Sequence, residues 1–100
     1  MTNEELDRLV AEKVVSGYKQ ENPVSYSTDA REALELLNLM IVDRGFTVII
    51  MSLRGNGGWR VGFHRNESSH GGNYWANGAT IPLAVCRAAL ATTGDLYAIE

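Results

Sequence analysis

Cysteine, clustered basic residues and long apolar runs are all scarce in this 100-residue sequence. Its single cysteine, Cys86, excludes an intrachain disulfide and favours a reducing compartment. The formal net charge is -3, and there is no cluster of lysine and arginine of the kind that binds nucleic acid by displacing counterions. The longest apolar run, near residues 46–51, is far shorter than the roughly 20 residues of a membrane span. We therefore expect neither a nucleic acid polymer nor a membrane among its partners.

The first residues and the length of the chain indicate its localisation and its number of domains. The polar opening Thr2 to Glu5 lacks the basic and then apolar pattern of a signal peptide, so a soluble, intracellular protein is expected. With 45% hydrophobic residues, the chain should form one small domain over residues 1–100. A domain of this size buries only about two thirds of its unfolded surface. A partner subunit would thicken the core, and we expect a homo-oligomer.

Helices are predicted near both ends of the chain. Thr2 and Glu5 form a capping-box pattern, and apolar residues then recur at helical spacing, which predicts a helix over about residues 3–16. Thr80 is placed to cap a last helix over about residues 81–92, with a proline in its first turn where a missing N–H costs little.

A further helix is predicted between these two. Ser27 or Thr28 offers an N-cap, Asp29 lies near the positive end of the helix dipole, and Gly45 ends the helix. Its apolar positions are Ala30, Ala33, Leu34, Leu36, Leu37, Met40 and Ile41. Because they cover much of the circumference, we expect this helix to pack on two neighbours.

Strands are predicted in the middle of the chain. Residues 46–53 are apolar at both alternating sets of positions, which indicates a strand covered on both faces. The glycine-rich residues 55–58 join it as a hairpin to residues 59–64. There, one face should carry Trp59, Val61 and Phe63, and the other Arg60, Gly62 and His64. Residues 73–77 are expected to add a short third strand.

These elements predict an α+β fold in the order helix, helix, hairpin, strand, helix, with an antiparallel sheet of about three strands. A sheet that is apolar on both sides implies helices on both sides. We therefore expect a small three-layer α-β-α sandwich, which a second subunit would complete.

Four segments carry a resemblance to a known family. They are LVAEKV (9–14), YSTDAREALELL (26–37), WRVGF (59–63) and ATIPLAVCRAAL (79–90). In this order, they resemble the phage ABA sandwich domain, a small family found in bacteriophage genomes. The resemblance implies an α-β-α sandwich of viral origin, expressed in the host bacterial cytoplasm. It implies no catalytic residues.

Few residues favour catalysis. His64 and His70, with Glu67 between them, match no HExxH spacing, and no thiol stands nearby, so solvated loop residues are the better interpretation. Cys86 lies within a helix among small apolar residues, which predicts a buried core position. The glycines of residues 55–58 do not precede a helix, as a phosphate-binding loop requires. We therefore predict no catalytic residue, no metal site and no cofactor. A hydrolase that uses His64 or His70 as its general base is an alternative to the two binding functions considered below.

Residues 59–80, WRVGFHRNESSHGGNYWANGAT, concentrate both tryptophans and both histidines among glycines and asparagines. Aromatic faces stack on bases, arginine binds phosphate, and asparagine binds sugar and base edges. The candidate ligand-binding residues are Arg60, His64, Asn73, Tyr74, Trp75, Asn77, Thr80 and Arg87. Gly62 should leave a gap between Arg60 and His64, and the first turn of the last helix should offer N–H groups to an anion.

Two functions from different classes fit this composition. The first is a non-enzymatic phage protein that binds a nucleotide-like small molecule. It would act as a counter-defence sponge for a nucleotide immune signal, such as an ADP-ribose derivative or a cyclic nucleotide, at a homo-oligomer interface. The alternative is a protein-interaction module that binds a host or phage protein. Tryptophan, tyrosine and arginine also dominate protein interfaces, so composition alone does not separate the two.

Overall fold

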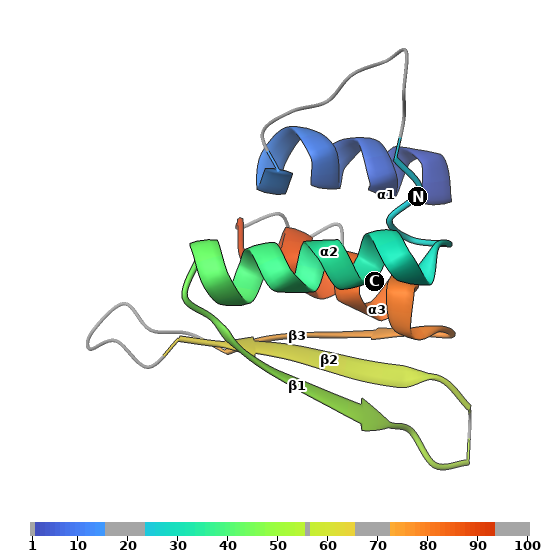
Figure 1. Cartoon of the computed structure of the whole chain (residues 1–100). Helices are drawn as coiled ribbons and strands as arrows, with labels where there is room; N and C mark the ends of the chain where they lie inside the picture. The colour runs from blue at the N-terminus through green and yellow to red at the C-terminus, as the bar shows by residue number, and fades with distance from the viewer. Residues whose placement is uncertain (1, 16–23, 56, 66–72, 94–100) are drawn as a thin grey trace.

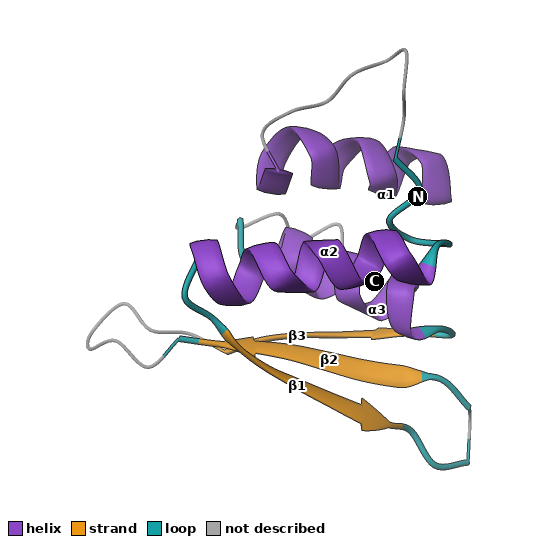
Figure 2. Cartoon of the chain, in the orientation of Figure 1, coloured by secondary structure: helices purple, strands orange, loops and turns teal. Residues whose placement is uncertain are grey.

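The computed structural model describes residues 2–15, 24–55, 57–65 and 73–93, and it confirms the predicted order of elements (Figure 1). The helices are α1 (Asn3–Val10), α2 (Ala30–Asn38) and α3 (Ile81–Ala91), and α1 and α2 continue into the wider π-helical turns η1 (Ala11–Val15) and η2 (Leu39–Asp43). The strands are β1 (Thr47–Ser52), β2 (Trp59–His64) and β3 (Asn73–Gly78) (Figure 2). The predicted end of the first helix at Ser16 lies outside the described residues.

Side-chain caps fix where the helices begin. Thr2 and Thr80 each accept a hydrogen bond from the backbone amide three residues later, as predicted. The N-cap of α2 is Asp29, whose carboxylate accepts a hydrogen bond of 2.9 Å from the amide of Arg31. The prediction of Ser27 or Thr28 as this cap was wrong, because both belong to a turn that precedes the helix.

β2 is the middle strand of an antiparallel sheet with the order β1-β2-β3. The predicted alternation is confirmed: Val61 and Phe63 are 0% exposed and face the helices, whereas Arg60 is exposed on the other face. Cross-strand register places Gly62 between Ile49 and Trp75. The face that carries Arg60 and Trp75 is called the outer face from here on.

The helices all lie on the inner side of the sheet, with α2 and α3 next to it and α1 beyond them (Figure 1). The α+β class and the three-stranded antiparallel sheet are as predicted, but the helices were expected on both sides of the sheet. The difference arises because α3 is apolar around most of its circumference. One side packs on β2 and β3 and the other on α1 and α2. The outer face therefore has no helix over it in the described chain.

The core is built around α3. Its buried residues are Ala84, Val85, Cys86, Ala88, Ala89, Leu90 and Ala91. Small side chains allow close approach: a Cβ at Gly78 would stand 2.6 Å from the backbone nitrogen of Ala84. The outermost helix is tied to the turn before α2 by a hydrogen bond of 2.8 Å, which the amide of Ser27 donates to the carboxylate of Asp7.

Candidate functional site

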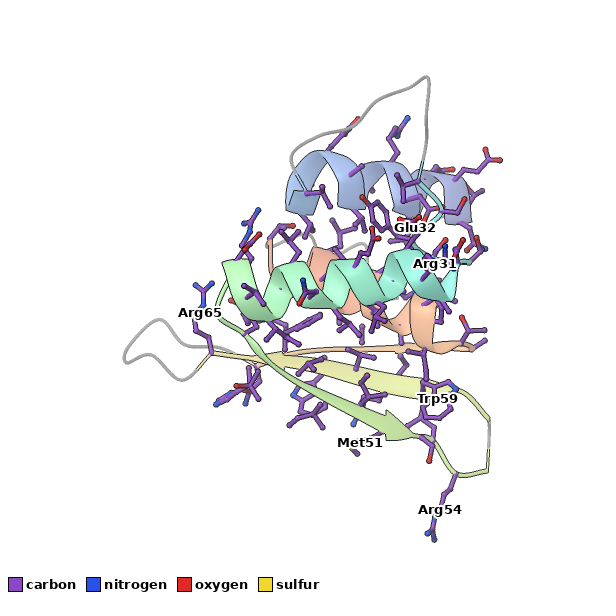
Figure 3. The ribbon with its side chains drawn as sticks, in the orientation of Figure 1. Arg31, Glu32, Met51, Arg54, Trp59 and Arg65 are labelled. Atoms are coloured by element: carbon purple, nitrogen blue, oxygen red, sulfur yellow. The ribbon has the colours of Figure 1, made fainter. Side chains whose placement is uncertain are left out.

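The outer face is organised in three cross-strand rows. Its residues are Thr47, Ile49 and Met51 on β1, Arg60, Gly62 and His64 on β2, and Asn73, Trp75 and Asn77 on β3. Five of the eight predicted ligand-binding residues are therefore brought together by the strand register. Ile49 is 42% exposed and Met51 is 45% exposed, so the polar rows stand beside uncovered apolar side chains. Met51 points away from the helices in Figure 3.

Arg60, Trp75 and Asn77 form a compact group on this face. The guanidinium carbon of Arg60 lies 5.8 Å from the centre of the Trp75 ring, and its Nε donates a hydrogen bond of 3.1 Å to the side-chain oxygen of Asn77. A cation–π contact at such an exposed site is worth about 0.5–1 kcal/mol. Together the two contacts hold a cation beside a half-exposed indole.

Gly62 does not leave the predicted gap. The indole of Trp75 covers it, and a Cβ at this position would stand 2.6 Å from two ring carbons. The absence of a side chain lets the indole lie flat against the strand. Gly62 therefore positions Trp75 and leaves no open slot.

Arg87 reaches the same strand from α3. Its Nη1 donates a hydrogen bond of 3.0 Å to the backbone oxygen of Asn77, whose side chain binds Arg60. Asn77 thus joins the two predicted arginines, one from the outer face and one from the helix side. At the opposite end of the rows, Nδ1 of His64 lies within hydrogen-bond distance of the side-chain oxygen of Asn73.

The other two predicted residues lie elsewhere. Tyr74 faces the helices, because it alternates with Asn73 and Trp75, and its ring meets Phe46 edge-on at 6.2 Å. Thr80 caps α3 and lines an apolar groove of about 410 Å³ that also contains Trp59. The first turn of α3 therefore does not point at the outer-face group.

Charge is unevenly distributed over the fold. Every acidic residue that the structure describes lies at or before Asp43, on the helical side of the domain. The arginines that follow are Arg44, Arg54, Arg60, Arg65 and Arg87. Within the described parts of the sheet and α3 there is thus no carboxylate side chain to repel an anion. This arrangement favours a negatively charged ligand on the sheet side.

The residues considered for catalysis were Cys86 and the group of His64, His70 and Glu67. Cys86 is 0% exposed, as predicted, and burial raises the pKa of its thiol, with a further contribution from Asp7. A thiol of this kind is a poor nucleophile. His70 and Glu67 lie outside the described residues, and within the described ranges no three His, Cys, Asp or Glu side chains gather as a metal would require.

Sequence reasoning missed a second polar site, a cavity of about 350 Å³ where the helices end. It is lined by Val14, Met40, Arg44, Phe46, Arg65, Tyr74, Thr92 and Thr93. The guanidinium of Arg65 lies 4.4 Å from the centre of the Phe46 ring. Hairpin register could have revealed part of it, because the start of β1 and the end of β2 are neighbours.

The fold is a small α+β domain with all described helices on one side of the sheet. Comparison with known proteins places the chain in a family. The sequence model of the phage ABA sandwich domain matches residues 8–90. The chain therefore belongs to this family and is a small domain of bacteriophage origin, as the resemblance predicted. No protein of curated function matches the sequence.

A solved structure has a similar fold. It is described as a phage protein from Bacillus cereus ATCC 14579, and it superposes with a TM-score of 0.76 at 18% sequence identity. The match covers 95% of this chain and 90% of the other. Within the described part of this chain, no helix is long and apolar enough to span a membrane.

Proposed function

We propose that this phage domain is a non-enzymatic small-molecule binder that sequesters a nucleotide immune signal of the bacterial host. An ADP-ribose derivative or a cyclic nucleotide has the required chemistry. The observation that carries the proposal is the outer-face group: a half-exposed indole, Trp75, held beside the guanidinium of Arg60 and the amide of Asn77. Trp75 offers a surface for a base, and the arginines offer donors for phosphate.

A second copy of the chain is part of this proposal. Small-molecule sites bury about 70–90% of a ligand, whereas one open sheet face covers only one side of it. Ile49 and Met51 add exposed apolar surface on the same face. Such surface is typical of an interaction site. A ligand held between two outer faces would be enclosed, which sequestration requires.

Recovery of the ligand tests the absence of catalysis. The protein is incubated with a bound nucleotide and then denatured, and the released compound is analysed by mass spectrometry. Sequestration predicts that the compound returns intact. A cleaved product would show that the protein is an enzyme, and the proposal would be abandoned.

Substitution tests the site. Arg60→Ala removes a charge-assisted contact worth roughly 1.5–3 kcal/mol, so nucleotide affinity should fall by at least about tenfold. Arg54→Ala is the matched control, because Arg54 lies on the turn after β1, beyond the paired rows of the outer face (Figure 3). Equal effects of the two substitutions would indicate a general charge effect and would contradict a site at Arg60.

Protein binding is the second candidate, favoured by an exposed apolar stripe on the helix formed by α2 and η2. Leu34 is 66% exposed, Ile41 is 43% exposed and Val42 is 68% exposed. If the domain instead captures a host or phage protein, Leu34→Asp should abolish that capture. In that case neither the unaltered protein nor Arg60→Ala should bind a nucleotide.

A further inference from the structure

We infer that the cavity at the helix ends is a second binding site, which takes a phosphate-bearing small molecule no larger than a mononucleotide. It is separate from the outer face and does not depend on the proposed function. Six elements meet around it: the ends of η1, η2 and α3, the starts of β1 and β3, and the end of β2. Figure 3 shows Arg65 at this end of the sheet and Arg54 at the other.

Two guanidinium groups line the cavity and are held by backbone carbonyls. Arg44 donates through Nη2 to the carbonyl of Val14, and Arg65 donates through Nη2 to the carbonyl of Arg44 at 2.7 Å. A guanidinium has five N–H donors, and each of these contacts uses one. The arginines are thus oriented by the fold while further donors remain to bind a ligand.

The charge balance favours an anion. The described lining residues include two arginines and no carboxylate. The helix ends carry only partial negative charge, and hydrogen bonds from Arg44, Thr92 and Thr93 satisfy several of their carbonyls. Thr92 and Thr93 donate their hydroxyl hydrogens to the carbonyls of Ala89 and Leu90, both at 2.6 Å, so their oxygens are left as acceptors. A phosphate ester that carries a hydroxyl group would match both kinds of partner.

Shape limits the size of this ligand. The volume of about 350 Å³ lies at the low end of the roughly 300–1,000 Å³ typical of small-molecule sites. Part of the wall is apolar or aromatic: Met40, Phe46 and Tyr74. Arg65 packs over Phe46, which fixes the plane of its guanidinium and leaves the edges for bidentate contact with phosphate. We therefore infer a ligand of about mononucleotide size.

The first test uses adenosine monophosphate and inorganic phosphate as probes of the unaltered protein, with amide and indole shifts followed by NMR. The inference predicts saturable shifts at the amides of Phe46 and Thr93 and little change at the indole N–H of Trp75. Shifts confined to Trp75 would overturn the cavity site and support the outer face. No saturable shift with either probe at millimolar concentrations would also overturn it.

The second test uses variants in calorimetric titration of adenosine monophosphate. Arg65→Gln should weaken binding by at least about tenfold, since a charge-assisted contact is lost. Arg65→Lys should weaken it less, because the charge stays. Arg54→Gln carries the same change in net charge and should have no effect. Equal losses for Arg54→Gln and Arg65→Gln would refute the inference, whereas Arg60→Gln should affect only the outer face.

Discussion

Adding one methyl group to Gly62 should displace Trp75 from the outer face. A Cβ there would stand 2.6 Å from two ring carbons, whereas ordinary contacts are 3.4–4 Å, so the indole must retreat by most of an ångström. Overpacking of this kind typically costs about 1–3 kcal/mol. We expect Gly62→Ala to lower the free energy of unfolding by that amount. For a domain of this size, each kcal/mol lowers the unfolding midpoint by about 4–8 °C.

The sign of the effect should reverse when the indole is absent. Without Trp75 the new methyl meets no ring, and alanine in a strand is more stable than glycine by roughly 0.5–1 kcal/mol. Gly62→Ala in a Trp75→Ala background should therefore be neutral or stabilising. Thermal unfolding of the four proteins by circular dichroism gives the coupling energy between the two positions. Equal destabilisation in both backgrounds would show that the cost does not come from the contact between Gly62 and the Trp75 ring, and would refute this reasoning.

The remaining predictions concern stability. Asp7→Ala removes the hydrogen bond from the amide of Ser27 and should lower the free energy of unfolding in urea by about 1–3 kcal/mol. Glu4→Ala, at an exposed position, is the control. An equal loss in both variants would contradict a specific attachment of α1 through Asp7. Burial raises the pKa of the Cys86 thiol above its ordinary 9.0. The unfolded chain therefore loses this proton near pH 9 while the folded chain keeps it, and stability should fall above that pH by up to about 1.4 kcal/mol per pH unit. Cys86→Ala should lack this component, so identical pH dependence in both proteins would contradict it.

Local sequence patterns were sufficient to predict the order of the elements and the two faces of β2. Alternation along residues 59–64 separated Val61 and Phe63 from Arg60 and His64, because the side chains of a strand alternate strictly between faces. The caps at Thr2 and Thr80 were likewise predictable, since each depends on residues within one turn. Cys86 was predicted to be buried from its small apolar neighbours alone, and it is.

Features that depend on packing between distant segments could not be predicted from local patterns. The apolar residues of β1 indicated helices on both faces of the sheet. Ile49 and Met51, on the outer face, are instead exposed. The reason is that α1 and α2 pack on the side of α3 that faces away from the sheet. At the cavity, Arg44 and Arg65 are held by hydrogen bonds to the backbone carbonyls of Val14 and Arg44. No sequence motif predicts such contacts between distant segments. The position of Tyr74 on the opposite face from Trp75, by contrast, could have been predicted, because consecutive strand residues point in opposite directions.

The most direct test of the central claim is thermal unfolding of the purified protein against a panel of cyclic dinucleotides and cyclic ADP-ribose isomers. A ligand at about 100 times its dissociation constant stabilises a native protein by roughly 2.7 kcal/mol. For a domain of this size, that corresponds to a rise of about 10–20 °C in the unfolding midpoint. Sequestration predicts such a rise with at least one compound, and its loss in Arg60→Ala but not in Arg54→Ala. An unchanged midpoint with every compound would contradict sequestration of these nucleotides.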